Sequence, residues 1–492
     1  MGIPCTMTRA NRVPGGEARA CWRVPALLFA LVWLSCTWFG SWAFNPNSAT
    51  RLLAATAIVE RGDARIDRFA DMTIDKALFD GHFYMDKAPG MTLMALPWVA
   101  LANHVTGQTS ADVPPKLFDP AAETFLRLRL RVAIAFTNAV LAALAAVALL
   151  QLGTGLTGSR AAGLFAAIGF ALGTTIWGWS TTYFGHAATT ALIAIALWAV
   201  WRGTSGGAPG RHALIAGLAL GWAVVIEHSA ILTGAPVALW ALWRIRTWAP
   251  PRIARTIGLA LAGGAAASIP LFAYNLAVFG HPFQTGYAGV VGFEGMQQGL
   301  FGLTYPKPDI LWEILGGKRR GIVWVAPVLV LAPFGIWTLL RDPRTRDIGV
   351  AAAAGAVVAF LYHASYVYWD GGNSTGPRHA LPAVAYLAIG LAAFWASANR
   401  VEKWLGGGFL AVSVALNLAI AAAEILAPHF YTAPVAQHVI PKFLSGDIRT
   451  IPGEFWGWSP RAGLGLYLAL AALLTALLAR AWQRESQAPE TA

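Results

Sequence analysis

Twelve apolar runs dominate this chain of 492 residues and constrain its fold more than any other feature. A transmembrane helix needs roughly 20 mostly apolar residues, so twelve crossings would use about 240 residues. Hydrophobic residues make up 57% of the chain and charged residues only 12%, whereas soluble proteins carry about 25% charged residues. A soluble enzyme, a fibrous protein and a disordered chain are therefore excluded. We predict an all-α polytopic membrane protein with about twelve spans, at 24–44, 131–152, 161–178, 186–202, 213–226, 229–243, 255–276, 320–340, 348–368, 380–398, 405–427 and 461–482.

A further apolar stretch, residues 88–103, decides the topology. It has Pro89 and Gly90 at its start and Pro97 inside it, and about 16 residues is short for a crossing. If it does not cross, the short inner loops hold twelve Lys and Arg residues and the short outer loops hold one, Arg378. Basic residues accumulate in cytoplasmic loops. We therefore predict an interfacial or re-entrant segment at 88–103.

This topology predicts one transmembrane domain with both termini in the cytoplasm. It comprises residues 24–482, between an N-terminus at 1–23 and a tail at 483–492. The inner loops and termini account for the net charge of +12, so no nucleic-acid partner is needed. The sequence contains no glycine-rich loop of the G-x-x-x-x-G-K-[ST] type that binds nucleotide phosphates. Chemistry is therefore expected on the outer face, where three large segments lie, at 45–130, 277–319 and 428–460.

The first outer segment contains charged residues directly beside the apolar stretch. Asp86 and Lys87 precede it, and Asp75 lies in the same loop, so these charges are expected at the membrane surface, where little water is present. A carboxylate there is suited to act as a general base, and a lysine is suited to hold a phosphate as a point charge. His82 and Tyr84 are expected to line the same site. Interfacial anchoring by Tyr84 and Lys87 is the alternative explanation.

Two arginines enter predicted spans from the outer side. Arg378 begins the tenth run, against the charge rule, and arginine is the residue best suited to bidentate phosphate contact. Tyr366 and His379 belong to the same outer loop and are expected to line the site. Arg131 enters the second run, and we expect it to help bind the anionic donor.

Ionisable residues also lie at the outer ends of later spans. Glu227 and His228 form the tip of a short hairpin between the fifth and sixth runs, and ionisable groups at membrane depth are costly and usually functional. His186 begins the fourth run. Asp86, His186 and His228 are candidate oxygen and nitrogen ligands for a divalent metal, which leaves a metal cofactor open. A helix-capping or interfacial role is the alternative for His186.

The order of these features resembles the GT-C glycosyltransferases, in the branch of the protein O-mannosyltransferases and the lipid A aminoarabinose transferase. A first helix precedes a large outer loop, and Asp86-Lys87-Ala88-Pro89 is similar to the family's Glu-Lys-Pro-Pro motif. The likeness covers about residues 24–245 and extends more loosely to residue 398. It implies about a dozen spans and a polyprenyl-phosphate-linked sugar as donor. In the family motif the lysine faces the donor phosphate, and the acid can take part in metal binding.

One position departs from the family pattern. Members usually carry an acidic pair just after the first span, and its Asp is the expected base. If Arg51 matches the arginine that follows this pair, the acidic positions are Ser48 and Ala49 here. Arg51 is still expected to line the site, but the base must come from elsewhere. Asp75 is the first choice and Asp86 the second.

We therefore predict an integral membrane hexosyl- or pentosyltransferase. It would move a sugar, with inversion, from a polyprenyl phosphate to an extracytoplasmic lipid, glycan or protein. The resemblance implies the bacterial inner (plasma) membrane, with the active site on the periplasmic face and membrane lipid around the spans. Two alternatives are a lipid-linked oligosaccharide ligase or polymerase, and a non-enzymatic lipid or solute transporter. A transporter predicts polar residues through both leaflets, whereas these residues cluster on one side.

Overall fold

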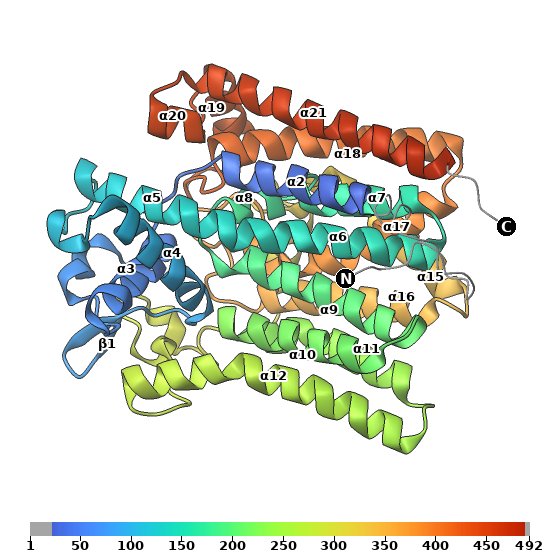
Figure 1. Cartoon of the computed structure of the whole chain (residues 1–492), viewed down its shortest axis with the longest axis horizontal. Helices are drawn as coiled ribbons and strands as arrows, with labels where there is room; N and C mark the ends of the chain where they lie inside the picture. The colour runs from blue at the N-terminus through green and yellow to red at the C-terminus, as the bar shows by residue number, and fades with distance from the viewer. Residues whose placement is uncertain (1–21, 488–492) are drawn as a thin grey trace.

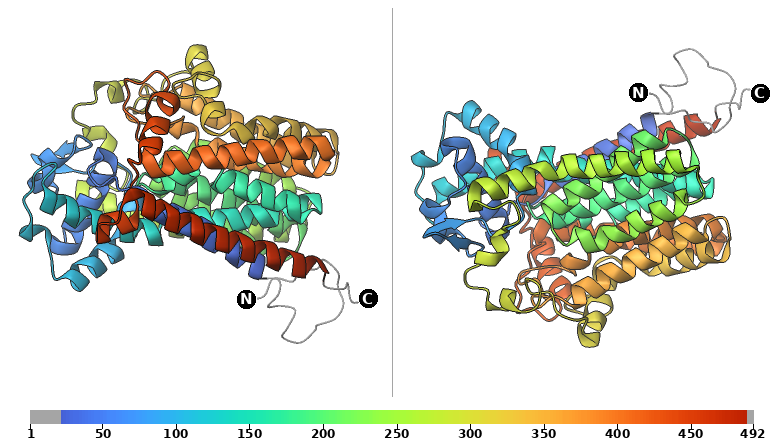
Figure 2. Two further views of the ribbon diagram at one scale, coloured as in Figure 1. Left: turned by 90° about the horizontal axis from the view of Figure 1, so that it is seen from above. Right: turned by 90° about the horizontal axis from the view of Figure 1, so that it is seen from below.

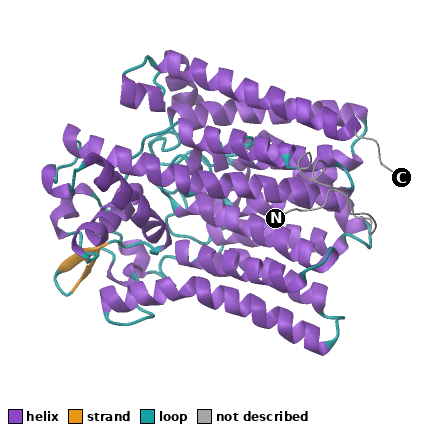
Figure 3. Ribbon diagram, viewed as in Figure 1, coloured by secondary structure: helices purple, strands orange, loops and turns teal. Residues whose placement is uncertain are grey.

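The computed structural model describes residues 22–487 and is built almost entirely from helices (Figure 1; Figure 3). Most of the predicted cytoplasmic N-terminus, and the last part of the predicted tail, lie outside the described residues. The two strands are β1 (Ala77–Phe79) and β2 (His82–Tyr84). The helices are α2 (Arg23–Trp38), α3 (Pro46–Arg61), α4 (Gly90–Thr106), α5 (Pro120–Phe136), α6 (Asn138–Thr157), α7 (Arg160–Ala171), α8 (Ile176–Ser180), α9 (Gly185–Ser205), α10 (Pro209–Ile226), α11 (Ala230–Ile245), α12 (Pro250–Phe279), α13 (Pro308–Leu315), α14 (Ile322–Val325), α15 (Ala332–Arg341), α16 (Arg346–Ala364), α17 (Pro382–Ser397), α18 (Arg400–Ala423), α19 (Ile440–Ser445), α20 (Ile451–Trp456) and α21 (Pro460–Gln487).

The predicted all-α architecture is confirmed. Among residues 22–487, seven helices are long and apolar enough to cross a membrane, and five shorter apolar helices accompany them. These correspond to the twelve predicted runs. In α9, 78% of the most apolar stretch is buried inside the protein, whereas only 17% of the corresponding stretch is buried in α12 and in α21. The first of these helices is therefore central, and the other two lie at the periphery of the bundle (Figure 1), where their apolar side chains suit contact with lipid.

One predicted span, 320–340, is not a continuous helix. A helix begins at Ile322 and ends at Val325, and Pro327 starts a 3-10 turn that precedes α15. Proline has no N–H and its ring clashes with the preceding turn, so it interrupts a helix. The freed backbone groups are satisfied by α18, since Asn417 donates to Val325 O at 2.8 Å and Ser413 Oγ accepts from Val328 N at 2.8 Å. Such replacement is required of irregular backbone inside a membrane protein.

The helices of the bundle approach one another closely where glycines meet. Between α10 and α12, a methyl group on Gly221 would lie 2.7 Å from Gly264 O, closer than a real carbon atom can come. Small residues at such crossings let helix backbones pack tightly when hydrophobic driving force is absent.

The first predicted outer segment forms one end of the molecule. In Figure 1 and Figure 2, α3, α4 and the hairpin lie together at this end, while α2 begins and α21 ends at the opposite end. The stretch 88–103 forms α4, which packs against α3 and α5 and is not one of the twelve apolar helices above. That 88–103 does not cross the membrane remains a prediction.

A two-residue turn sets the geometry of the β-hairpin. Asp80 and Gly81 both have positive φ, at 49° and 79°, the conformation that a type I′ hairpin turn requires and that an Asp-Gly pair adopts readily. The strands pair antiparallel, with Ala77 opposite Tyr84. If this register is continued by two residues on each strand, away from the turn, Asp75 lies opposite Asp86 at the open end of the hairpin.

Candidate active site

A cavity of about 350 Å³ lies at the end of the bundle that carries the predicted outer segments. Segments far apart in the sequence contribute to its wall, so the first outer segment and the loop at 369–379 share one end of the molecule, as predicted. The lining residues are Asn45, Pro46, Asn47, Ile74, Asp75, Asp86, Lys87, Phe184, Tyr287, Val290, Phe293, Met296, Tyr366, Tyr368, Asp370, Gly371, Gly372, Asn373, Arg378 and His429.

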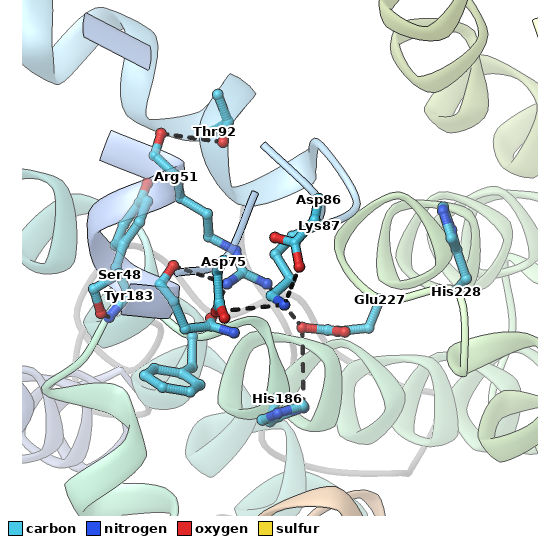
Figure 4. Close-up of polar contacts among 12 residues, drawn as sticks. Ser48, Arg51, Asp75, Asp86, Lys87, Thr92, Tyr183, His186, Glu227 and His228 are labelled. Atoms are coloured by element: carbon cyan, nitrogen blue, oxygen red, sulfur yellow. Dashed lines mark hydrogen bonds and ion pairs between the residues drawn. The ribbon is translucent and has the colours of Figure 1, made fainter. Parts of the chain in front are cut away.

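Lys87 bridges the two carboxylates at the open end of the hairpin. Its Nζ lies 2.6 Å from Asp86 Oδ2 and 3.4 Å from Asp75 Oδ2, as Figure 4 shows. The hairpin register brings the two acids together, and Lys87 directly follows one of them. The structure therefore unites three predicted site residues that the sequence separates by up to twelve positions.

Burial changes the protonation of this group. Desolvation raises the pKa of Asp86 to about 6, and the attraction of Lys87 offsets only part of this effect. Asp86 is 1% exposed, and its Oδ1 has no hydrogen-bond partner among residues 22–487. Desolvation alone would lower the pKa of Lys87, but the charges of Asp75 and Asp86 raise it above its ordinary value. The ammonium therefore stays charged, while Asp86 titrates near pH 6.

Arg378 supplies the second cation of the cavity. Its guanidinium lies over the ring of Phe184, 5.0 Å from the centroid, and its Nε lies 3.5 Å from His379 Nε2. In the part of the chain that the structure describes, it forms no ion pair with a carboxylate. Arg378 and Lys87 line the same cavity, together with the carboxylates of Asp75, Asp86 and Asp370, so the cavity places two cations beside three acids.

Behind the cavity wall lies a buried ion pair. Arg51 NH2 donates to Glu227 Oε1 at 3.1 Å, and its NH1 donates to Asn47 O at 3.1 Å and to the Asn47 side-chain oxygen. His186 Nδ1 lies 3.9 Å from the same oxygen of Glu227. Burial raises the pKa of Glu227, and Arg51 opposes that shift. The pair joins α3 to the α10–α11 turn and fixes Asn47, which lines the cavity.

A cluster of aromatic rings continues this wall. The ring centroid of His379 lies 5.0 Å from those of both Tyr366 and His186, and 5.3 Å from that of His363. Tyr366 lines the cavity, and His379 packs behind it. Both residues therefore lie in the predicted region, with only the tyrosine reaching the open space.

Arg131 lies outside the cavity, which corrects its predicted role as a phosphate ligand. Its Nε donates to Glu454 Oε2 at 2.8 Å, and its NH1 donates to Phe39 O at 2.6 Å and Thr37 O at 3.2 Å. All of these partners belong to α2, the residue after it, and α20. Arg131 therefore joins helices, with its Nε and NH1 donating to the protein and its NH2 2.8 Å from Glu454 Oε2.

Three further predicted residues also do not line the cavity. His82 follows the turn, so it lies at the far end of the hairpin from Asp86, with its Nδ1 2.9 Å from Asp67 Oδ2. Tyr84 packs its ring against Phe79 and Phe279. For His228, Nδ1 lies 3.2 Å from Val224 O and the ring packs edge-on against Tyr287. The predicted site-lining roles of these three residues are corrected accordingly.

The predicted metal site is not assembled either. Within the described residues, no group of three or more His, Cys, Asp or Glu side chains is arranged to hold a metal ion. The Lys87 ammonium occupies the position between Asp75 and Asp86 in which a cation would bridge them. His186 and His228 face other partners. These residues do not fit a divalent metal, and Lys87 is the cation of this carboxylate pair.

Several cavity residues were not singled out from the sequence. Tyr368 is one of them: it follows Tyr366, which bridges Leu303, but residues 367–370 form turns, so no strand periodicity marks it. His429 has no local signal, since only the fold brings its segment to the cavity.

The chain is similar to two kinds of solved membrane transferase. ArnT from Cupriavidus metallidurans bound to undecaprenyl phosphate is 13% identical, with a TM-score of 0.49 over 95% of this chain and 79% of that chain. The archaeal oligosaccharyltransferase AglB from Archaeoglobus fulgidus, in complex with an inhibitory peptide and a dolichol-phosphate, is 12% identical. Its TM-score is 0.42, over 86% of this chain and 56% of that chain. No protein-family model and no curated protein matches the chain.

Proposed function

We propose that the protein is a membrane glycosyltransferase that moves a single sugar from a polyprenyl phosphate to an acceptor hydroxyl outside the cytoplasm. One observation carries this proposal. Two cations, Lys87 and Arg378, line one cavity at the end of an apolar helical bundle. Lys87 bridges two carboxylates, whereas Arg378 has no carboxylate partner in residues 22–487. That position brings a phosphate at the membrane surface, a sugar and a base together.

In the proposed reaction, Asp86 takes the proton. The acceptor oxygen forms a bond to the anomeric carbon, and the bond from that carbon to the phosphate oxygen breaks, leaving its electron pair on the phosphate. The hydroxyl proton passes to the carboxylate. A base works best when its pKa lies near the operating pH, and Asp86, with a pKa of about 6 and a buried Oδ1 that has no hydrogen-bond partner among residues 22–487, meets this condition. This reverses the order of preference expected from the sequence, and Asp75 becomes the second candidate.

Lys87 and Arg378 bind the donor phosphate in this proposal. A polyprenyl phosphosugar carries one negative charge, and the departing phosphate gains a second. Cations already placed near the leaving group stabilise the developing charge without reorganisation. Lys87 also ties the two functions together, because its movement toward the phosphate leaves Asp86 with a weaker counter-ion and a greater affinity for a proton.

The same observations favour a single-sugar transferase over the two alternatives. A cavity of about 350 Å³ lies at the lower end of the range of small-molecule sites and suits one sugar phosphate better than an oligosaccharide donor. A transporter needs a polar path through both leaflets, whereas the cavity and its ion pairs gather at one end of the bundle.

The test combines lipid identification with a transfer assay. Mass spectrometry of lipids that co-purify with the native protein should identify a polyprenyl phosphate or its sugar ester. In vesicles containing the purified protein, Asp86→Asn should retain donor binding and lose at least about a hundredfold in transfer, as expected for a lost general base. Asp71→Asn, at an exposed acid of the same segment, is the matched control. Full transfer in Asp86→Asn would assign the base to Asp75, and full transfer in both Asp86→Asn and Asp75→Asn would refute the proposal.

A further inference from the structure

Arg320 is a buried arginine that binds a single turn beside the cavity. Its side chain is part of a residue only 1% exposed. Its Nε donates to Asp370 O at 2.6 Å and its NH2 donates to Gly372 O at 2.7 Å. These two carbonyls flank Gly371, so the fork of one guanidinium holds the turn on both sides of that glycine.

The held glycine packs directly against Arg378. An ideal Cβ built on Gly371 would lie 2.9 Å from Arg378 Nε, and Gly371 has a φ of +68°. A side chain is therefore excluded for two reasons, close approach and backbone conformation. Apart from this turn, the Arg378 guanidinium is backed by the faces of Phe184 and Trp179 and lies 3.5 Å from His379 Nε2. The position of the turn therefore sets how far Arg378 extends into the cavity.

Arg320 is a buried cation, because a guanidinium stays protonated in proteins. Within the described residues it forms no direct ion pair, and the carboxylates of Asp370 and Glu313 attract it only from a greater distance. Its third donor, NH1, bonds Arg319 O at 3.2 Å, so all of its hydrogen bonds go to backbone carbonyls. Burying a charge is costly even when it is hydrogen-bonded. This arrangement therefore indicates a role beyond stabilising the loop.

We propose that Arg320 is a positioning residue for donor binding: by clamping the 370–372 turn, it holds the Arg378 guanidinium in place against the donor phosphate. This inference rests on the proposed function, because it presumes that Arg378 binds phosphate. Lysine cannot replace Arg320, since a single ammonium lacks the planar fork that reaches both carbonyls. A misplacement of about 1 Å in a positioned group can cost about a hundredfold in rate.

The experiment measures the binding of farnesyl phosphate to the full-length protein in detergent. Arg320→Lys should raise the Kd at least about tenfold, since it leaves Arg378 present and misplaced. Gly371→Ala should have a similar effect by displacing Arg378 directly, and it provides the test if Arg320→Lys does not fold. In the Arg378→Ala background, Arg320→Lys should add less than about twofold, because a residue that acts through another has no separate effect once that residue is gone.

Arg129→Lys is the matched control. Arg129 is also fully buried and donates to two backbone carbonyls, Phe125 O and Gln108 O, both at 2.9 Å, but it does not line the cavity. The Arg129→Lys variant should have a lower melting temperature and an unchanged Kd for farnesyl phosphate.

Two results would overturn the inference without affecting the proposed function. One is an unchanged Kd in both Arg320→Lys and Gly371→Ala, and the other is an equal loss with and without Arg378. Failure of the unmodified protein to bind farnesyl phosphate would refute the proposed function and the inference with it.

Discussion

Removal of Lys87 should move the acid limb of the transfer activity to higher pH. Asp86 must be ionised to accept a proton, so the activity of the unmodified protein should fall as the pH drops through about 6, the pKa of this carboxyl. The Lys87 ammonium lies 2.6 Å from Asp86 Oδ2. At this distance the Coulomb attraction is about 1.6 kcal/mol even with the dielectric constant of water, or a little more than one pKa unit. In Lys87→Met the acid limb should therefore lie near pH 7 or above.

The assay is kcat/KM against pH, between about pH 5 and 8.5, with protein in lipid vesicles. Lys87→Met should also bind donor less well, so the midpoint of the acid limb is the informative quantity and not the absolute rate. Lys76→Met is the control, because Lys76 Nζ donates to Ala70 O at 2.5 Å and contacts neither carboxylate. An acid limb that stays near pH 6 in Lys87→Met would show that Asp86 is not the titrating base.

Three further predictions concern donor binding, stability and topology. Lys87→Ala and Arg378→Ala should each weaken donor binding by about 2–5 kcal/mol, and their combined loss should be less than additive if they share one phosphate; full additivity in a binding assay would assign them to different groups. Glu227→Gln leaves the buried Arg51 without its ion pair, so the free energy of unfolding in detergent should fall by about 3–5 kcal/mol, and an unchanged denaturation midpoint would contradict this. A cysteine introduced by Asp63→Cys should react with a membrane-impermeant reagent in sealed cells, whereas reaction only after permeabilisation would reverse the predicted orientation.

The membrane-spanning part of the fold could be predicted from the sequence because each crossing leaves its own local signal. An apolar run of sufficient length is visible without knowledge of its neighbours, and the charge of the short loops predicts which side of the membrane each loop faces. The exception at 320–340 arises because Pro327 lies inside an apolar run. The composition of the run does not reveal that Ser413 and Asn417, about 90 residues later, form hydrogen bonds with the backbone groups freed at this break.

The candidate site was predictable only in part, for a physical reason. Asp86 and Lys87 are neighbours and lie beside an apolar stretch, so their environment could be inferred locally. The position of Asp75 depends on the hairpin register, and the Asp80-Gly81 turn was the overlooked signal. Arg131 was misassigned because a basic residue at the outer end of a span has the same pattern whether it binds a ligand or a neighbouring helix. Its partner, Glu454, is 323 positions away.

The bridged lysine has a consequence for which anions the cavity accepts. A ligand must compete with Asp75 and Asp86 for the Lys87 ammonium, and both carboxylates are held beside it at high effective concentration. Inorganic phosphate and soluble sugar phosphates offer only polar contacts, so they enter this competition at a disadvantage. A phosphate on a long hydrocarbon tail also gains from placing that tail in the membrane, about 0.8 kcal/mol for each buried methylene. Under the proposed function, the ion pairs that neutralise Lys87 at rest would therefore favour anions delivered by the lipid phase over dissolved ones.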